Sequence, residues 1–403
     1  MENANKPANA KVSLIVPMYC CENFVDTFLD ELCGQAYCNI EIICVVDGSP
    51  DRTLELVEKY TQKDERVHVY LQEHKGSGAA RNFGLSHATG EYVMFPDADD
   101  EYASNYISRM VQAIERSHAD ISVCQVLAVD AQLHTRAKNR GYSFLFYPED
   151  RAIPTTSIKG LTRSINPIPH NKIFKRDFLI ENGLLFSETM SLNDVFFSAS
   201  ALISAKDISF VKDHLITYIK HRNPQSISTT RSTHPGDMVF VYRQLYEWLV
   251  EKGVLKTYFS DFLMNWTGSM HSYARICQGT VFTDSIVREL VCEAPWKDMT
   301  DRELQNGTLL NCAIAKRVLK KQRSKLKQTA IPAEQTAIQR RILAAEREIE
   351  NCTEIKRRLQ HEYGRKYSDW ETVAFIRIRQ ARHVGLITTA QIVYRRLLSH
   401  ISP

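Results

Sequence analysis

Apolar and polar positions along the first hundred residues predict an alternation of strands and helices. Short, nearly continuous apolar runs occupy residues 12–16, 40–46, 67–71 and 92–95, and such runs are typical of strands that are buried on both faces. Apolar residues at helical spacing lie in the stretches between these runs. Because connections between parallel strands are right-handed and place helices above and below the sheet, the pattern predicts a parallel sheet with helices on both faces.

Three of the predicted strands end in polar or turn-forming residues, at the edge where sheets of this kind bind ligands. Tyr19 follows the first strand, Asp47-Gly48 the second and Asp97-Ala98-Asp99 the fourth. Tyr19 can stack on a nucleoside, and Asp47 can accept a hydrogen bond from a base or a ribose. The structural alternatives are a core tyrosine with a solvated hydroxyl and a plain turn at Asp47-Gly48.

The fourth strand ends in three carboxylates. In an extended backbone Asp97 and Asp99 point to the same side, so two oxygen donors can face one cation. The pattern predicts a metal-and-phosphate site for Mn²⁺ or Mg²⁺. The alternative is an acidic helix start at Asp100, before the helical run that begins near Ile107.

The glycine-rich segment after the third strand does not match a dinucleotide fingerprint. Gly76 and Gly78 have the right spacing, but Arg81 stands where the third glycine belongs. No P-loop sequence is present either. We interpret Arg81 as a cation near a phosphate or a base, with a surface helix position as the alternative.

Four stretches in this order resemble the motifs of family 2 glycosyltransferases. They are Val12–Tyr19, Val46–Asp51, Gly76 with Ala80–Leu85, and Gly90–Asp100. The resemblance extends from about residue 11 to about residue 228. It implies the GT-A fold, with a mostly parallel central sheet, a bound nucleotide-diphospho-sugar and a divalent ion held by the D-x-D motif.

The resemblance also implies roles for individual residues. It assigns five residues to nucleotide binding: Pro17, Tyr19, Asp47, Arg81 and Asp97. It assigns Asp99 to the metal as direct ligand, together with Asp97. The family usually has Asn where this chain has Cys20 and a second acid where it has Val46.

The acceptor side is expected farther along the chain. The stretch that contains Lys172 resembles the acceptor-side strand and loop of the family, and Asp194 takes the place of its general base. Asn193 stands where family members commonly have Glu. A helix N-cap is the alternative for Asp194. A later loop resembles the one that closes over the diphosphate, which makes His221 a third candidate metal ligand and Arg222 a diphosphate contact; a surface histidine is the alternative.

Length and composition predict two domains. The 403 residues are 44% hydrophobic and 24% charged, which suffices for a large core. We expect a disordered tail at 1–10, a GT-A domain at 11–230 and an α-helical domain at 231–403. Because the start lacks the apolar core of a signal peptide and the ten cysteines lack metal spacing, we expect a cytoplasmic protein with reduced thiols.

The C-terminal part carries most of the positive charge. Residues 311–403 contain about 20 Lys and Arg against about 8 Asp and Glu. Two helical patterns divided by Pro332 predict a basic helical hairpin, which can pack on the catalytic domain, form a homo-oligomer contact or seat the acceptor. The basic end can also lie on an anionic membrane as a peripheral contact. We do not expect nucleic-acid binding, because aromatic interleaving and a known binding module are both missing.

Together these features predict an inverting, metal-dependent glycosyltransferase in the cytoplasm, where it can also contact the inner face of the cell membrane. It would move a sugar from a nucleotide donor, with UDP-sugar the expected class, to a glycan or lipid-linked acceptor in surface polysaccharide synthesis. One alternative is a nucleotidyltransferase, which would carry a glycine-rich loop where this chain has Pro17-Met18-Tyr19. The other is a catalytically silent scaffold that binds partners through its helical half.

Overall fold

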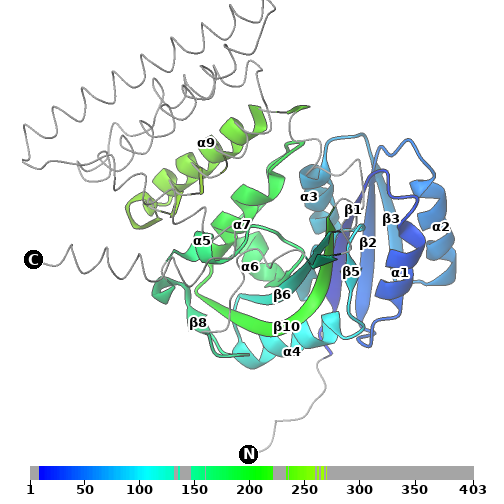
Figure 1. The fold of residues 1–403 in the computed structure, drawn as a ribbon, viewed down its shortest axis with the longest axis horizontal. Coiled ribbons are helices and arrows are strands. Elements are labelled where there is room, and N and C mark those ends of the chain that lie inside the picture. Colours follow the sequence, from blue (N-terminus) through cyan, green and yellow to red (C-terminus); the bar gives the residue numbers. More distant parts are fainter. Residues whose placement is uncertain are drawn as a thin grey trace, which may run out of the picture. The chain divides into compact units, whose positions relative to one another are not determined.

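The computed structural model describes residues 9–130, 135–136, 147–158, 160–220, 233–234 and 236–258, with single positions up to residue 269 (Figure 1). The chain divides into two compact units, Met1–Leu245 and Tyr246–Pro403. The division lies within helix α9 (Gly236–Glu251). The predicted basic hairpin and the basic end of the chain lie outside the described residues, and the site belongs to the first unit.

Half of the sheet is parallel, as the apolar runs predict. Strands β1 (Val12–Met18), β2 (Ile40–Asp47), β3 (Val67–Gln72) and β4 (Tyr92–Met94) lie in the order β3-β2-β1-β4 with every pairing parallel. All residues of β2 are buried, which explains why its run is apolar apart from Glu41 and the terminal Asp47.

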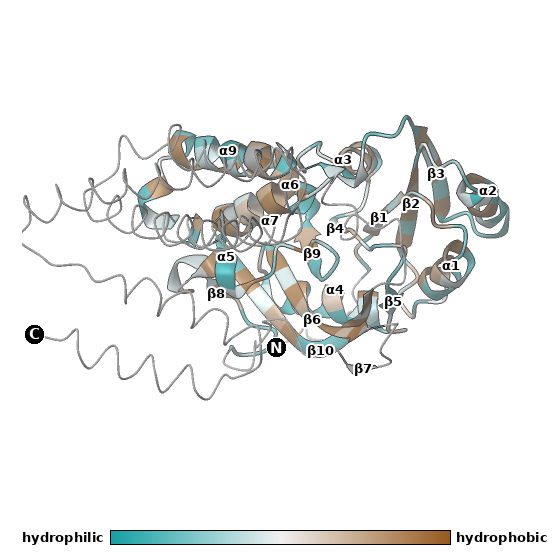
Figure 2. Ribbon diagram, turned by 45° about the horizontal axis from the view of Figure 1, so that its top comes forward, coloured by the Kyte–Doolittle hydropathy of each residue, from teal (hydrophilic) through white to brown (hydrophobic). Residues whose placement is uncertain are grey.

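Helices cover both faces of this half. Helices α1 (Val25–Cys33) and α2 (Thr53–Lys63) lie on one face and α3 (Ser77–His87) on the other (Figure 2). Each helix connects two parallel strands, which is the arrangement that right-handed crossovers produce.

Beyond β4 the sheet becomes mixed. The order continues as β9-β6-β10-β5, where β9 (Lys172–Lys175) pairs antiparallel with both β4 and β6 (Ile121–Asp130). Strand β10 (Asp207–Lys220) runs parallel to β6 and antiparallel to β5 (Glu101–Tyr102). This half also includes β7 (Thr135–Arg136), β8 (Ile153–Pro154) and the helices α4 (Tyr106–Ser117), α5 (Leu161–Ser164), α6 (Arg176–Glu181) and α7 (Asn193–Ser204).

Four aromatic rings join the two halves beneath the site. Phe95 lies directly after β4. Its ring contacts three others at centroid distances of 5.0–5.9 Å: Phe174 of β9, Phe197 of α7, and Phe186, which lies between α6 and α7. Phe186 and Phe197 stack at 3.9 Å. Burial of rings of this size contributes about 2 kcal/mol or more each, so the cluster holds the start of α7 beside the end of β4.

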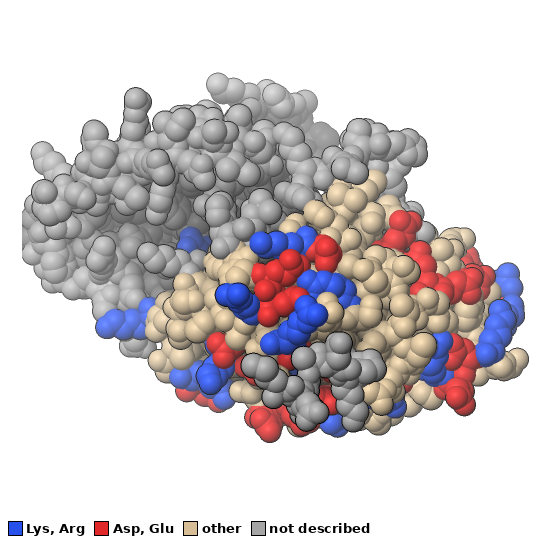
Figure 3. Space-filling view, turned by 90° about the horizontal axis from the view of Figure 1, so that it is seen from below, with Lys and Arg blue, Asp and Glu red and all other residues tan. Residues whose placement is uncertain are grey.

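The surface is mixed in charge on the face shown in Figure 3, where Lys and Arg lie among Asp and Glu. The ion pairs follow the same pattern: Arg109 contacts Glu149, Asp150 and Asp213 at 2.6–2.9 Å. Among the described residues, no helix combines the length and apolarity that a membrane crossing requires.

Candidate active site

The three acids after β4 form a turn. The backbone N–H of Asp100 donates to the carbonyl of Asp97 at 3.3 Å, and the N–H of Asp97 donates to the hydroxyl of Tyr102 at 2.7 Å. The extended backbone expected from the sequence is therefore wrong here. A turn brings its first and fourth residues together, so Asp97 and Asp100 face a common partner.

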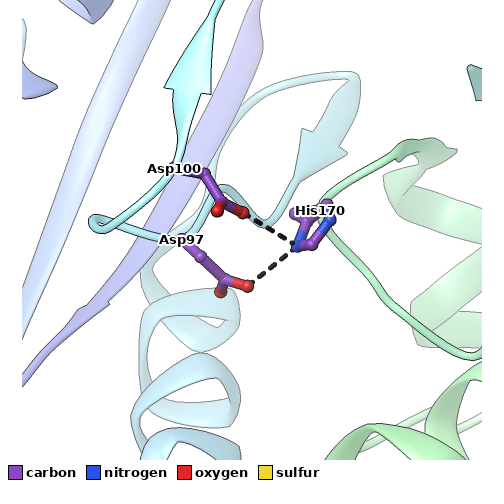
Figure 4. A group of neighbouring side chains, drawn as sticks. All are labelled: Asp97, Asp100 and His170. Carbon is purple, nitrogen blue, oxygen red and sulfur yellow. Dashed lines mark hydrogen bonds and ion pairs between the residues drawn. The ribbon is translucent and has the colours of Figure 1, made fainter. Parts of the chain in front are cut away.

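That partner is His170, from the loop before β9. Its Nδ1 lies 2.8 Å from Oδ2 of Asp97 and 3.5 Å from Oδ2 of Asp100 (Figure 4). The residue is only 3% exposed. Its other ring nitrogen, Nε2, is buried and has no hydrogen-bond partner among the described residues, which is unusual for a buried polar atom.

Arg81 of α3 holds the other side of Asp97. Its guanidinium donates to Oδ1 of Asp97 at 2.7 Å and lies 5.2 Å from the ring centroid of Phe186. Burial opposes ionisation of Asp97, but Arg81 and His170 outweigh it and hold the pKa of Asp97 well below its ordinary value. The Asp97 carboxylate is therefore negative at neutral pH.

The acidic turn offers ligands that a divalent cation prefers. One atom each of Asp97, Asp100 and His170 lies within 4.8 Å of the others, and carboxylates with an imidazole suit Mn²⁺ and also serve Mg²⁺. These residues therefore fit a divalent ion. Asp99 is half-buried in the same turn, and its role as direct ligand stays a prediction. His221 lies outside the described residues.

Asp47 at the end of β2 holds the loop between β3 and α3. Its buried carboxylate accepts hydrogen bonds from Gln72 Nε2 and the backbone N–H groups of Lys75 and Gly76 at 2.6–2.8 Å, and its Oδ2 lies 2.9 Å from Nδ1 of His74. In this state the carboxylate is occupied by the protein's own donors. Its predicted contact with a nucleobase would require one of them to move.

The ring of His74 stacks on Tyr19 at 4.1 Å, with 20° between the planes. Tyr19 is thus a half-buried side chain beside a loop histidine rather than a core residue. Pro17 lies in β1, paired with Val45. We find no local signal in the sequence that would have selected His74, because its contact with Tyr19 depends on loop packing.

Two backbone positions near Tyr19 need a left-handed conformation. Gly48 has φ +59°, and a Cβ there would lie 2.7 Å from the backbone nitrogen of His74, so only glycine fits. Cys20 has φ +50°. Asn adopts this region more readily than most residues, which explains why Asn suits the position that Cys20 occupies.

Asp194 lies in the first turn of α7. The N-cap is Leu192, with φ +55°, so the N-cap alternative for Asp194 is wrong. The carboxylate is half-buried, and its charge acts on Lys172. Its assignment as general base stays a prediction.

Lys172 is fully buried. Its Nζ donates to the carbonyls of Asn166 and Ile168 and to Oδ1 of Asn171 at 2.6–2.9 Å. Burial lowers the pKa of Lys172 to about 7, against the opposing effects of Cys124 and Asp194. Lys172 therefore anchors the loop that carries His170. Arg222 lies outside the described residues.

A known protein family matches the part of the chain that contains the acidic turn. Residues 13–183 match the model of glycosyl transferase family 2. They form a family 2 glycosyltransferase domain. The transferase domain has the GT-A fold, as the sequence motifs predict, and the acidic turn, Arg81 and the Asp47 loop all lie within it.

Bacterial glycosyltransferases are among the proteins similar to this chain. The glycosyltransferase EpsJ of Bacillus subtilis (strain 168) is 32% identical over 222 residues, which are 54% of this chain and 62% of EpsJ. The poly(ribitol-phosphate) beta-N-acetylglucosaminyltransferase TarS of Staphylococcus aureus (strain MW2) is 28% identical over 58% of this chain and 39% of TarS. The chain thus spans about three fifths of the length of EpsJ and about two fifths of the length of TarS.

A solved structure has the same fold. The crystal structure of S. aureus TarS 1–349 in complex with UDP-GlcNAc aligns with a TM-score of 0.53 at 20% identity, over 89% of this chain and 93% of that one. At this identity the likeness establishes the fold of the transferase domain and leaves its ligands open.

Of the predicted site residues, the structure brings Arg81 and Asp97 into direct contact and places Tyr19 and Asp47 around one loop. It adds His170 and His74, to which no role was assigned from the sequence, and it places Asp100, considered above as a helix start, against His170. His170 was missed because its contact joins residues 73 positions apart, and only the β4–β9 pairing brings them together.

Proposed function

We propose that this protein is an inverting, metal-dependent glycosyltransferase that uses a nucleotide-sugar donor, with UDP-sugar the expected class. The observation that carries the proposal is the convergence of Asp97, Asp100, Arg81 and His170 at the carboxyl end of β4, inside a family 2 domain. The acceptor would be a hydroxyl of a glycan or glycoconjugate in cell-surface polysaccharide synthesis.

The nucleoside would bind at the ends of β1 and β2. Tyr19 offers an aromatic face for the base, and the loop held by Asp47 lies beside it. The diphosphate would then extend toward the acidic turn, where Arg81 supplies a fixed positive charge.

The acidic turn would hold the divalent ion through Asp97, Asp100 and His170, with Asp99 as the further ligand that the family resemblance implies. When bound, such an ion supplies positive charge that offsets the negative charge building on a departing nucleoside diphosphate. Arg81 already neutralises part of the charge of Asp97, which limits repulsion between the carboxylates and a phosphate.

Asp194 would act as the general base. It would take the proton of the acceptor hydroxyl while the acceptor oxygen bonds to the anomeric carbon and the bond from that carbon to the diphosphate oxygen breaks. Because one displacement forms one bond and breaks the other on opposite faces, the anomeric configuration inverts. No second nucleophilic carboxylate is needed.

Relatives support the choice of donor and acceptor. TarS has been crystallised with UDP-GlcNAc, and its name describes transfer to poly(ribitol-phosphate). A poly(ribitol-phosphate) beta-glucosyltransferase of Bacillus spizizenii is 28% identical over 54% of this chain. A hydroxyl-rich surface polymer is therefore the acceptor class that we propose.

Release of UDP from a panel of UDP-sugars tests the proposal. We expect release in the presence of Mn²⁺ with at least one of UDP-glucose, UDP-galactose and UDP-GlcNAc. A chelator and Asp99→Ala should each abolish it. Asp177→Ala, which alters a carboxylate that is 84% exposed on α6, is the matched control and should keep full activity. Chelator-resistant release, or full activity in Asp99→Ala, would contradict the metal-dependent mechanism.

A further inference from the structure

Asn193 connects the start of α7 to the donor side of the site. Its Oδ1 accepts a hydrogen bond from NH1 of Arg81 at 3.0 Å, and its Nδ2 donates to Oγ of Ser77 at 2.9 Å. The side chain is almost fully buried, at 3% exposure. Ser77 and Arg81 lie four residues apart on α3 and therefore share one face of that helix.

The close packing around Asn193 depends on a glycine. A Cβ on Gly78 would lie 2.1 Å from the carbonyl oxygen of Ser187 and 2.8 Å from Cβ of Asn193. Only a residue without a side chain lets α3 approach the segment before α7 this closely. The contact between Asn193 and Arg81 is thus part of a tightly packed interface.

An amide suits this position better than a carboxylate. The carbonyl of Thr189 lies 3.5 Å from Nδ2 of Asn193, and a carboxylate oxygen in place of this NH₂ group would repel it. The oxygen side of the amide faces NH1 of Arg81, a donor that needs a hydrogen-bond acceptor at this point. Asn193 supplies both groups and no charge.

The neutral amide decides how the charge of Arg81 is shared. Within the described part of the chain, Asp97 is the carboxylate that forms an ion pair with Arg81. A Glu or Asp at position 193 would be a second one, and the positive charge would then be divided between them. With Asn193, Arg81 is oriented without losing charge to a second carboxylate.

We propose that Asn193 is a positioning residue of the donor site, which acts through Arg81 to orient the acidic turn and adds no second carboxylate that would compete with Asp97 and the donor diphosphate for the positive charge of Arg81. This inference rests on the proposed function. It assigns two adjacent residues of α7 to different substrates: Asn193 would act on the binding of the sugar donor, and Asp194 would act on the acceptor hydroxyl.

Two nearly isosteric variants separate the two parts of this role. Asn193→Leu removes the hydrogen bond to Arg81, and Asn193→Asp adds a competing charge. We expect the Kd for UDP with Mn²⁺, measured by titration calorimetry, to rise about tenfold in Asn193→Leu, because the lost bond involves a charged group. It should rise further in Asn193→Asp.

Kinetics distinguish this role from a merely structural one. The KM for the donor should rise in both variants by more than kcat falls. Asn82→Leu is the matched control, because Asn82 is also an amide of α3 and bonds only to the backbone of Phe186 in the facing segment. It should lose thermal stability as the Asn193 variants do and keep UDP binding within about twofold of the wild type.

Three results would overturn the inference. If the wild type binds UDP and both Asn193 variants bind it within twofold, Asn193 does not act on the donor site, and the proposed function stands. The same holds if kcat falls while donor KM and Kd stay unchanged. If the wild type binds none of UDP, GDP, CDP and ADP with Mn²⁺, the inference and the proposed function both fail.

Discussion

Buried acidic side chains lie at both ends of the parallel strands, and the two ends use them differently. At the start of β2 the carboxylate of Glu41 accepts hydrogen bonds from Lys11, Ser13 and Thr89 at 2.5–2.9 Å. At the end of β4 Asp97 and Asp100 share His170, whose Nε2 has no hydrogen-bond partner.

The difference separates a structural carboxylate from a candidate functional one. Glu41 is a single acid, and the chain provides a cation and several hydrogen-bond donors to its carboxylate. Glu41 therefore links the segments at the starts of the strands. The acidic turn places three acids in four residues next to an imidazole with an unused nitrogen. Two carboxylates and an imidazole whose ligand atoms lie within 4.8 Å of one another form a donor set that can hold a divalent cation.

The largest effect that we expect is on catalysis, from Asp194→Asn. This variant keeps the shape of the side chain and removes its basicity, so kcat should fall by a factor of about 100 to 10,000. The Kd for UDP with Mn²⁺ should stay within about twofold, since Asp194 is assigned to the acceptor. Unchanged turnover would remove Asp194 from the mechanism.

The next effect concerns stability at the other end of the strands. Burial opposes ionisation of Glu41, but hydrogen bonds from Lys11, Ser13 and Thr89 outweigh it and lower the pKa of Glu41 to about 2, from an ordinary value of 4.5. A shift of this size corresponds to about 3 kcal/mol of stability. Glu41→Gln should lose about this much at pH 7 in urea unfolding and should bind UDP normally once folded.

The pH dependence of this contribution has a defined direction. Because the folded-state pKa is depressed, the stabilisation is fully present above pH 4.5 and is lost as the pH falls toward 2. The difference in unfolding free energy between wild type and Glu41→Gln should therefore shrink across this window. A difference that is constant from pH 7 to pH 2.5 would contradict the assignment.

A smaller effect should follow from His170→Phe, which keeps a buried ring and removes both nitrogens. Affinity for Mn²⁺ alone should fall at least about 10-fold, the loss typical of removing even a partner of a metal ligand, because His170 is one of the three groups proposed to hold the ion. His170→Asn can retain an N–H toward Asp97 and should recover part of the affinity. His68→Phe, on the exposed side of β3, is the control, and equal Mn²⁺ binding in His170→Phe would rule out this role.

The smallest effect is a gain of stability in Cys20→Asn. Cys20 is held at φ +50°, and Asn tolerates this region at lower cost, so the variant should be more stable by about 1 kcal/mol or less. The midpoint of thermal unfolding should rise by about 2–4 °C. Cys38→Asn, at an exposed position without positive φ, should leave it unchanged.

The sequence predicted the parallel half well because each strand there carries its own signal. Continuous apolar runs marked β1, β2, β3 and β4, and turn residues such as Gly48 marked their ends. The mixed half was less accessible to prediction. Strand β9 is four residues long, and its antiparallel place between β4 and β6 depends on contacts distant in sequence rather than on local periodicity.

For the site, the sequence by itself determined which chemical groups are present and where along the chain they lie: Tyr19, Asp47 and Asp97 at or after strand ends, and Arg81 and Asp194 near helix starts. Only the tertiary structure decided which of them meet. Asp97 and Asp100 meet at His170, because Tyr102 and His170 bind the turn. The physical reason is that side-chain periodicity is a local property, whereas a shared ligand sphere depends on strand order and on packing across the sheet.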